Sequence, residues 1–257
     1  MPWYFLLPLG VVVGLAGTII GAGGGFILTP LLLLWHPGDP PERITALSLF
    51  VVMCNATSGT IGYARQGKVD FRAGVAFALT GIPGAILGAA ITHYVSRPVF
   101  DPLMGAMLLT GSLFLIWRSR HPFPNTGASE TRLTRDRLIK GTILSFGIGV
   151  LAALLGIGGG IVHVPLLIYW LHYTVHRAAA TSHFVLALTA MAAVGTHITR
   201  GELSGRWDEA IPLGIGAVIG AQIGAALAPK LRGGPLVVGL AVALGLVAAR
   251  LIWRGLG

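Results

Sequence analysis

Long apolar runs separated by short polar breaks dominate this sequence. The nine Asp and Glu residues fall between these runs or at their ends. A membrane-spanning helix needs about 17 to 25 apolar residues, and eight runs of that order or longer are present. They cover residues 3–35, 44–64, 71–94, 99–117, 138–171, 178–199, 209–227 and 235–253. The pattern predicts an all-α integral membrane protein with about eight transmembrane segments.

Two of these runs are too long for one straight crossing. The first and the fifth each hold about 33 residues, which a continuous helix would extend over about 50 Å, whereas the hydrocarbon core is about 30 Å thick. Each contains a glycine run, at residues 21–25 and 156–160, and a proline follows five residues after each run. Four glycines in five positions make a poor helix. We therefore expect two broken or re-entrant helices, each starting again at Phe26 or Ile161.

The two glycine runs also indicate an internal duplication. A shift of 135 positions places Gly21, Gly23, Gly24, Gly25, Pro30 and Trp35 on Gly156, Gly158, Gly159, Gly160, Pro165 and Trp170, and shifts of 134 and 136 extend the match. We expect two homologous four-segment transmembrane repeats, residues 1–118 and 138–257, joined by a linker at residues 119–137. Each repeat opens with its Gly-rich broken helix.

The distribution of Lys and Arg predicts the orientation. Basic residues concentrate between Arg118 and Lys140, and cytoplasmic loops are the loops that collect Lys and Arg. The linker is therefore expected to be cytoplasmic in a multi-pass protein of the cell (inner) membrane. This holds whether all eight segments cross or each broken segment returns to its starting side, so parallel and inverted repeats both stay open. The N-terminus lacks a basic n-region and a convincing cleavage site, so the first apolar run is expected to stay in the mature protein.

Composition supports the membrane interpretation and argues against other classes. The chain is 54% hydrophobic and 11% charged, whereas soluble domains are about 25% charged. Its net charge of +9 is explained better by anionic lipid headgroups than by nucleic acid. The glycine runs lack the G-x-G-x-x-G spacing of a dinucleotide site. With neither a Cys/His cluster nor a nucleophile–base pair in the sequence, we expect no metal, no cofactor and no enzymatic activity.

The glycine runs are the first candidates for a substrate site. Irregular backbone at membrane depth is tolerated only beside protein or a watery cavity, and glycine lets a ligand approach the main chain. A helix that restarts there points free N–H groups and its positive dipole end into the gap. Two such ends would bind a small anion without a charged side chain. The predicted substrate-binding glycines are Gly21, Gly23, Gly24, Gly25, Gly156, Gly158, Gly159 and Gly160.

Close helix crossing is the alternative role for glycine in a membrane protein. We favour it for the glycines that are spaced along one helix face, namely Gly81, Gly84, Gly88, Gly216, Gly220 and Gly224.

Several polar side chains within the apolar runs complete the candidate site. Asn55, His183 and Gln222 could contact a bound oxyanion, and His163, His183 and His197 could relay protons. Helix packing is the alternative role for each. Because the runs are free of carboxylates, any ion coupling must use histidine, the substrate or backbone carbonyls.

A longer glycine pattern brings in a family resemblance. Gly14, Gly17, Gly21, Gly23, Gly24, Gly25, Pro30 and Leu31, repeated in part from Gly156 to Leu166, resemble the TauE/SafE sulfite exporter family. The second copy departs from the first, with Ala152 where Gly17 stands. The resemblance spans both halves and implies a bacterial or archaeal inner-membrane permease for sulfite, organosulfonates such as sulfoacetate, or related anions.

These observations lead to a secondary carrier that moves a small anion by alternating access about a midplane site. An anion channel with the same backbone-amide site and a transporter of a small carboxylate are the alternatives. The expected partners are the anionic substrate and the lipid bilayer, with no nucleic acid. The oligomeric state stays open, a homodimer being one option.

Overall fold

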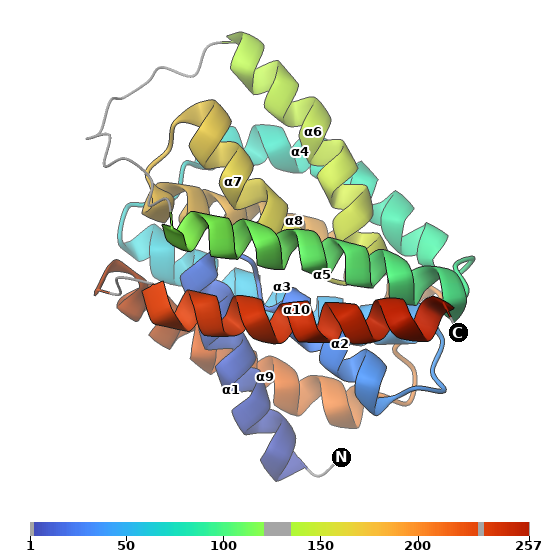
Figure 1. Cartoon of the computed structure of the whole chain (residues 1–257). Coiled ribbons are helices and arrows are strands. Elements are labelled where there is room, and N and C mark those ends of the chain that lie inside the picture. Colours follow the sequence, from blue (N-terminus) through green and yellow to red (C-terminus); the bar gives the residue numbers. More distant parts are fainter. Residues whose placement is uncertain (1–2, 121–134, 231–233, 257) are drawn as a thin grey trace. The chain divides into compact units, whose positions relative to one another are not determined.

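A computed structural model describes residues 3–120, 135–230 and 234–256, and all secondary structure in these ranges is helical (Figure 1). The helices are α1 (Trp3–Ile20), α2 (Gly25–Trp35), α3 (Pro41–Arg65), α4 (Phe71–Thr92), α5 (Arg97–Arg120), α6 (Arg135–Leu155), α7 (Gly160–Leu171), α8 (Val175–Thr199), α9 (Trp207–Leu227), a 3₁₀ turn (Ala228–Lys230) and α10 (Gly234–Leu256).

The helices coincide with the apolar runs seen in the sequence. Each of the eight runs forms one helix, except that the first and fifth form two each, so the expected breaks are confirmed. Helix resumes at Gly25 and Gly160, one residue earlier than expected. By length and composition, α1, α3, α4, α8 and α9 are the described helices long and apolar enough to cross a membrane, and α2, α7 and parts of α6 and α10 are shorter apolar helices.

The chain divides into two compact units. The described residues within 3–93 and 135–229 form the larger unit, which contains α1 to α4 and α6 to α9. The described residues within 94–120, with residues 230 and 234–256, form the smaller one, in which α5 and α10 pack against each other. Within that pair the Ser112 hydroxyl donates to the carbonyl of Ala241 at 2.7 Å.

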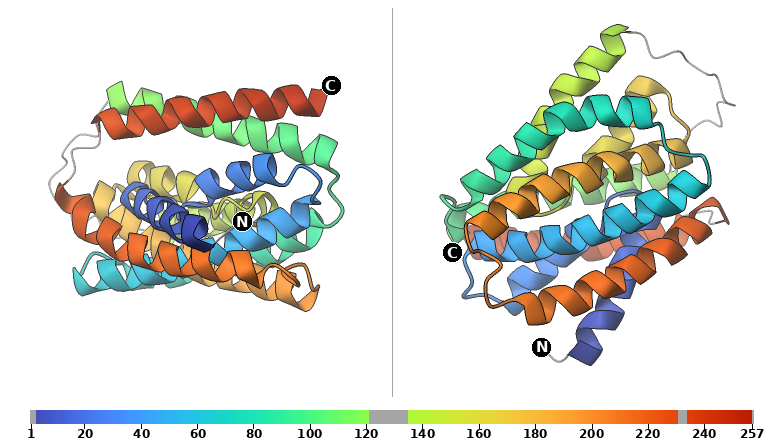
Figure 2. Two further views of the ribbon diagram at one scale, coloured as in Figure 1. Left: turned by 90° about the horizontal axis from the view of Figure 1, so that it is seen from below. Right: turned by 180° about the vertical axis from the view of Figure 1, so that it is seen from behind.

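The larger unit has two ends, which ion pairs and hydrogen bonds define. End A gathers the starts of α3 and α9 with the ends of α4 and α8, where Arg206 pairs with Asp39. End B gathers the starts of α4 and α8 with the ends of α3 and α9, where Arg177 pairs with Asp70. Helices α3 and α8, which pack against each other, therefore run in opposite directions (Figure 2, right).

The first broken segment begins and ends at end A. The rings of Phe5, near the start of α1, and Trp35, at the end of α2, lie 6.1 Å apart, and His36 pairs with Glu209 at the start of α9 at 3.3 Å. The α1–α2 segment is thus a hairpin whose tip is the glycine run.

The second broken segment is a hairpin of the opposite direction. A Cβ on Gly141, near the start of α6, would lie 2.6 Å from the ring of Phe77 in α4. After α7, the Tyr173 hydroxyl donates to Asp70 at 2.6 Å. Because α4 starts at end B, both arms of the α6–α7 hairpin reach that end.

The predicted role of glycine in helix crossings is confirmed between α4 and α6 and between α9 and α1. A Cβ on Gly84 would lie 2.2 Å from the carbonyl oxygen of Phe146, and one on Gly220 would lie 2.2 Å from that of Val11. These are contacts with backbone, so only glycine lets the two main chains approach so closely.

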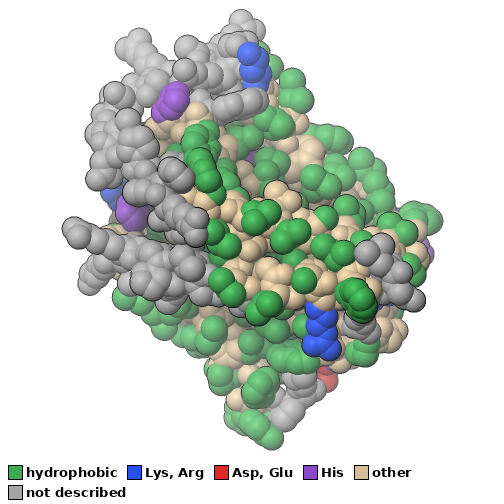
Figure 3. Space-filling model, in the orientation of Figure 1, with side chains coloured by type: hydrophobic (Ala, Val, Ile, Leu, Met, Phe, Trp, Pro, Cys, Tyr) green, Lys and Arg blue, Asp and Glu red, His purple; other side chains and the backbone are tan. Residues whose placement is uncertain are grey.

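The distribution of residue sizes is that of a protein built for lipid. Leu79 and Ile143 are 68% and 67% exposed, whereas much of the interior of the larger unit consists of Ala, Gly, Ser and Thr. Hydrophobic side chains predominate among the described residues visible in Figure 3. A soluble protein rarely exposes apolar patches of this extent, and small interior residues are typical of packed transmembrane helices. The chain is therefore a multi-pass membrane protein.

Candidate functional site

The first glycine break owes its shape to backbone angles that only glycine adopts readily. Gly21, Gly23 and Gly24 have φ of 84°, 77° and 81°, in the left-handed region that disfavours a side chain. The amides of Ala22 and Gly23 fold back onto the carbonyl of Gly17 at 2.8 and 3.2 Å. The break is thus a compact turn that ends α1 and reverses the chain into α2.

The second break has the same backbone. Gly156, Gly158 and Gly159 have φ of 69°, 82° and 71°. The amides of Ile157 and Gly158 fold onto the carbonyl of Ala152 at 3.1 and 3.5 Å. Every hydrogen bond of the first turn therefore recurs 135 positions later, and both glycine runs are buried.

Each break leaves amide groups without an acceptor. No side chain caps the N-terminus of α2 or α7. Among the hydrogen bonds of the described residues, none is donated by the three amides at each restart, those of Gly24, Gly25 and Phe26 and of Gly159, Gly160 and Ile161. Buried N–H groups at a helix N-terminus, with the positive end of the dipole, favour an anion.

The two breaks lie against each other. A Cβ on Gly25 would come within 2.6 Å of the carbonyl oxygen of Gly156, and one on Gly160 within 2.4 Å of that of Gly21. The contacts are reciprocal, which is the pattern of a two-fold relation. They bring the N-terminal ends of α2 and α7 side by side inside the larger unit.

Hydroxyl groups donate hydrogen bonds to the carbonyls of Gly21 and Gly156, where the two breaks meet. Ser48 of α3 donates to the carbonyl of Gly156 at 2.8 Å, and Ser182 of α8 donates to that of Gly21 at 3.3 Å. Thr29 adds a second bond to Gly156, at 2.7 Å. With the carbonyls of Gly21 and Gly156 bonded to hydroxyl groups, the unpaired amides of the two helix N-termini remain beside them as hydrogen-bond donors.

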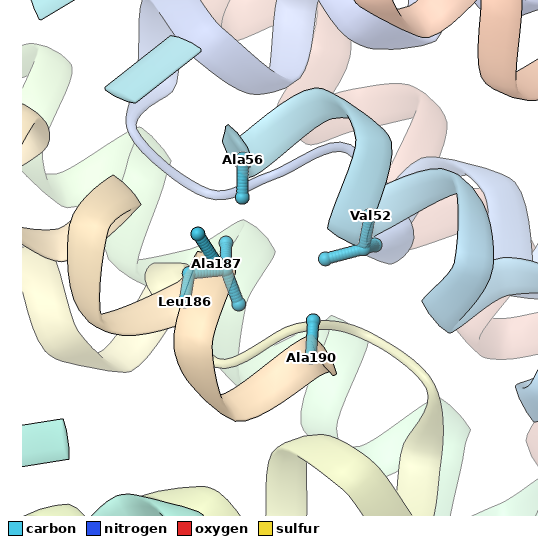
Figure 4. Packing of buried hydrophobic residues seen from close by; sticks show 5 residues of the cluster. All are labelled: Val52, Ala56, Leu186, Ala187 and Ala190. Carbon is cyan, nitrogen blue, oxygen red and sulfur yellow. The ribbon is translucent and has the colours of Figure 1, made fainter. Parts of the chain in front are cut away.

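An apolar cluster from α3 and α8 lies beside the breaks (Figure 4). It consists of Val52, Ala56, Leu186, Ala187 and Ala190. A Cβ on Gly23 would lie 2.3 Å from a methyl of Leu186, and one on Gly158 would lie 2.7 Å from a methyl of Val52. These two side chains rest directly on the glycine backbone and exclude water from it.

Asn55 and Gln222, both predicted to bind substrate, make contacts between helices. Asn55 accepts a hydrogen bond from the Thr18 hydroxyl at 2.8 Å and donates to the carbonyl of Gly14 at 3.0 Å. Gln222 donates to the carbonyl and hydroxyl of Ser58 at 2.7 and 2.8 Å. Asn55 therefore supports the first break from behind, while Gln222 joins α9 to α3.

His183, predicted both to bind substrate and to relay protons, directly follows Ser182, which bonds to Gly21. Its Nδ1–H donates to the carbonyl of Ala179 at 3.2 Å, and its ring meets Tyr63 edge to face at 5.6 Å. Gly59 makes room for it, since a Cβ there would lie 2.6 Å from the imidazole. Its Nε2 is buried and has no hydrogen-bond partner in the described structure.

The other two candidate relay histidines lie in different parts of the unit. His163 is buried, and its Nε2 lies 3.1 Å from the Ser145 hydroxyl. Because that hydroxyl donates to the carbonyl of Phe77 at 2.9 Å, the imidazole is the donor to it. His197 is buried at end A and bonds through Nδ1 to Glu202. The three histidines thus form no single chain.

At end B, one carboxylate joins the two hairpin exits. Asp70 Oδ2 accepts hydrogen bonds from Tyr173 at 2.6 Å and Arg177 at 2.8 Å, and Oδ1 accepts one from the amide of Ala73 at 3.1 Å. Burial raises the pKa of Asp70, but the three hydrogen bonds and the charge of Arg177 lower it by more, so its pKa lies below the usual value. Burial and the neighbouring Asp70 raise the pKa of Tyr173.

Sequence reasoning missed several residues of this region. Val52 and Leu186 look like any apolar helix residues, and Glu202 lies outside the apolar runs. The equivalence of Val52 with Leu186 under the 134-position shift was the available signal. In the described part of the chain, no group of three His, Cys, Asp or Glu residues is placed to hold a metal ion.

Buried helix breaks with unpaired amides, inside an all-helical unit with an apolar exterior, define the architecture of a multi-pass membrane transporter. The family described as Sulfite exporter TauE/SafE matches residues 6–251. The chain therefore belongs to the TauE/SafE family of membrane transporters, as its glycine pattern indicated.

Similar proteins occur in bacteria and archaea. The probable membrane transporter protein YunE of Bacillus subtilis is 27% identical over 273 aligned residues, covering 100% of this chain and 99% of the relative. A probable membrane transporter protein of Xylella fastidiosa is 29% identical over 248 residues, covering 95% and 93%. One of Methanocaldococcus jannaschii is 27% identical over 203 residues, covering 76% and 73%. No solved structure matches the chain.

Proposed function

We propose that this protein is a secondary carrier that moves a small anion, such as sulfite or an organosulfonate, across the cell membrane by alternating access. The observation that carries the proposal is the pair of adjacent helix N-termini whose amides lack acceptors. Such ends hold anionic groups in other broken-helix transporters. The substrate-binding residues in this proposal are the eight glycines of the breaks, with His183 beside them.

The proposal includes an inverted repeat. Each half contributes a re-entrant hairpin with its glycine break at the tip, and the two hairpins enter from opposite ends. The opposed directions of α3 and α8 fit this arrangement. The second glycine hairpin then presents the same backbone to the substrate as the first, turned over in the membrane.

The position of the basic linker indicates how the protein is oriented in the membrane. The basic linker leads into α6, whose start lies at end B. Since basic loops stay in the cytoplasm, end B is the cytoplasmic end and end A faces outward.

The closed packing at the breaks favours a carrier over a channel. Val52 and Leu186 rest on the glycine backbone, so an anion reaches the amides only when α3 and α8 separate. A carrier that must change conformation in each cycle saturates and exchanges substrate across the membrane.

A flux assay in proteoliposomes tests this function. The purified protein is reconstituted, and sulfite, methanesulfonate, sulfate and acetate are offered outside, with the same anion or none inside. We expect saturable uptake of sulfite or the sulfonate, accelerated when the same anion is trapped inside. Uptake that stays proportional to concentration and ignores the trapped anion would identify a channel. Selective uptake of acetate would identify a carboxylate transporter.

A further inference from the structure

End A contains an open cavity of about 550 Å³ whose lining includes charged residues and none of the glycine-break residues. Its charged lining consists of Glu42 and Arg43 from the start of α3, His93 at the end of α4, and Arg200 and Glu202 after α8. An open space lined by titratable groups, at the end of the two helices that flank the glycine breaks, is a candidate for a second ligand site.

The innermost group of this cavity is a carboxylate–imidazole pair. The chain turns sharply at Gly201, with φ of 72°, and the amide of Glu202 bonds to the carbonyl of His197 at 3.1 Å. This turn folds Glu202 back so that its Oε2 meets Nδ1 of His197. The side chain of His197 is fully buried, and that of Glu202 is 7% exposed.

The pair is incompletely bonded, although it is buried. Nε2 of His197 and Oε1 of Glu202 have no hydrogen-bond partner in the described structure. Buried polar atoms normally find partners, and those without one need an explanation. A group that gains and loses a proton would explain the missing partners, because the number of hydrogen bonds that it can donate or accept changes with its protonation state.

A route for protons leads from water to the pair. His93 is half exposed, and its Nδ1 lies 3.7 Å from Oε1 of Glu202 and 3.7 Å from Oε1 of Glu42. The groups that face the pair are thus His93 from α4, Glu42 and Arg43 from α3, and Arg200 at the end of α8. With both histidines neutral, two carboxylates and two guanidinium groups balance, and one added proton makes the cavity positive.

We propose that His197 and Glu202 form a proton-binding site that couples anion transport to protons at end A. The inference rests on the proposed anion carrier and adds its coupling ion. An added proton gives the mouth of end A a positive charge and so favours the entry of an anion. By linkage, a bound anion then favours the proton to the same degree.

Helices α3 and α8, which border this cavity, also contact the breaks. Helix α8 carries His197 at end A and Ser182 and Leu186 at the centre, and α3 carries Glu42 at end A and Ser48 and Val52 at the centre. A change in charge between the ends of α3 and α8 therefore acts on the elements that must separate to admit the anion.

The test follows anion and proton together in proteoliposomes. Methanesulfonate serves as the main probe because its own charge is constant between pH 5 and 9, and sulfite is run beside it. We expect protons to enter with the anion, as a trapped pH dye reports, and the apparent affinity at end A to fall about tenfold between pH 6 and 8, within the usual range of coupling between sites. In Glu202→Gln and in His197→Gln the pH profile becomes flat, whereas the matched variant Asp208→Asn, an exposed acid at the same end, behaves as the wild type.

Each outcome decides between the inference and its alternatives. Anion flux without proton entry, or an unchanged pH profile in both folded variants, would overturn the coupling and leave the carrier intact. A complete lack of anion flux in the wild type at every pH would instead overturn the carrier and the coupling with it. If the variants transport too slowly to follow, thermal unfolding in detergent between pH 5 and 8 reads the same titration without any anion. Parallel curves for wild type and Glu202→Gln would then reject the proton site.

Discussion

The two glycine breaks share one backbone but differ in the side chains that support them. At the first break, the Tyr63 hydroxyl donates to the carbonyl of Thr18 at 2.8 Å, and Thr18 in turn bonds Asn55. At the second break Ala153 takes the place of Thr18, so the hydroxyl of that network is absent. The backbone that faces the proposed ligand is thus constant, and only its support varies.

The residues that touch the first carbonyl of each break differ in the same way. Gly156 accepts hydrogen bonds from both Ser48 and Thr29, whereas Gly21 accepts one from Ser182. Val164, which takes the place of Thr29 at the first break, has no hydroxyl, and one of its methyl groups would lie 2.9 Å from a Cβ on Gly21. The comparison teaches that the turn is the shared requirement. The surrounding side chains give the two breaks different numbers of supporting hydrogen bonds, a difference that we call unequal bracing.

The largest effect is expected from a side chain at the breaks themselves. Gly24→Ala and Gly159→Ala each force a non-glycine residue to φ near 80° or 70°, a strain of about 1–2 kcal/mol, and set a Cβ against α1 or α6. We expect transport to fall at least about tenfold in both, by the flux assay. Gly147→Ala, on an exposed face of α6 with open space around it, is the matched control. Loss in only one of the two break variants would show that a single break binds the anion.

Removing one serine hydroxyl is expected to separate the two breaks. Ser182→Ala removes the hydrogen bond that the described structure gives the carbonyl of Gly21, at a cost of about 1–3 kcal/mol for a buried unsatisfied group. Ser48→Ala is expected to cost less, because Thr29 still donates to Gly156. Thermal unfolding and apparent anion affinity measure the difference. Equal effects of the two substitutions would contradict the unequal bracing.

The charge at end B is expected to contribute less, and its contribution depends on pH. Asp70→Asn keeps a helix-capping side chain but removes the charge that Arg177 and Tyr173 hold. Since the folded pKa of Asp70 is depressed, its stabilisation is present above the unfolded pKa near 4 and is lost as the pH falls through the folded value. We expect about 1–2 kcal/mol at pH 7. A denaturant titration at pH 7 and at pH 3 checks this, and a constant difference between the two pH values would refute it.

The smallest effect is expected from adding the missing hydroxyl. Val164→Thr places a hydroxyl at the first break in the position that Thr29 has at the second. A new hydrogen bond to the carbonyl of Gly21 would stabilise the fold by about 0.5–1.5 kcal/mol, and the loss of a buried methyl group would offset part of this gain. Alone it should change stability little. Combined with Ser182→Ala it should recover part of the lost melting temperature, and absence of any recovery would show that Val164 is not equivalent to Thr29.

Much of the fold was predictable because helix breaks and membrane-length apolar runs are local properties. The glycine run from Gly21 to Gly25 predicts a helix break, since few other sequences adopt repeated positive φ. The return of each hairpin to its starting end was not predictable, because the charge distribution fits both topologies and the deciding contact, Phe5 with Trp35, joins two separate helices. The pairing of His197 with Glu202 depends on the turn at Gly201, which the apolar pattern does not encode.

The packing of α4 on α6 and of α9 on α1 has a consequence for how the chain is made. Gly84 and Gly88 fit only against the backbone of α6, and Gly216 and Gly220 only against that of α1. These close crossings therefore form only after both halves of the chain have been synthesised. The N-terminal half must wait in the bilayer during synthesis, and two separately expressed halves should assemble only when they are produced together.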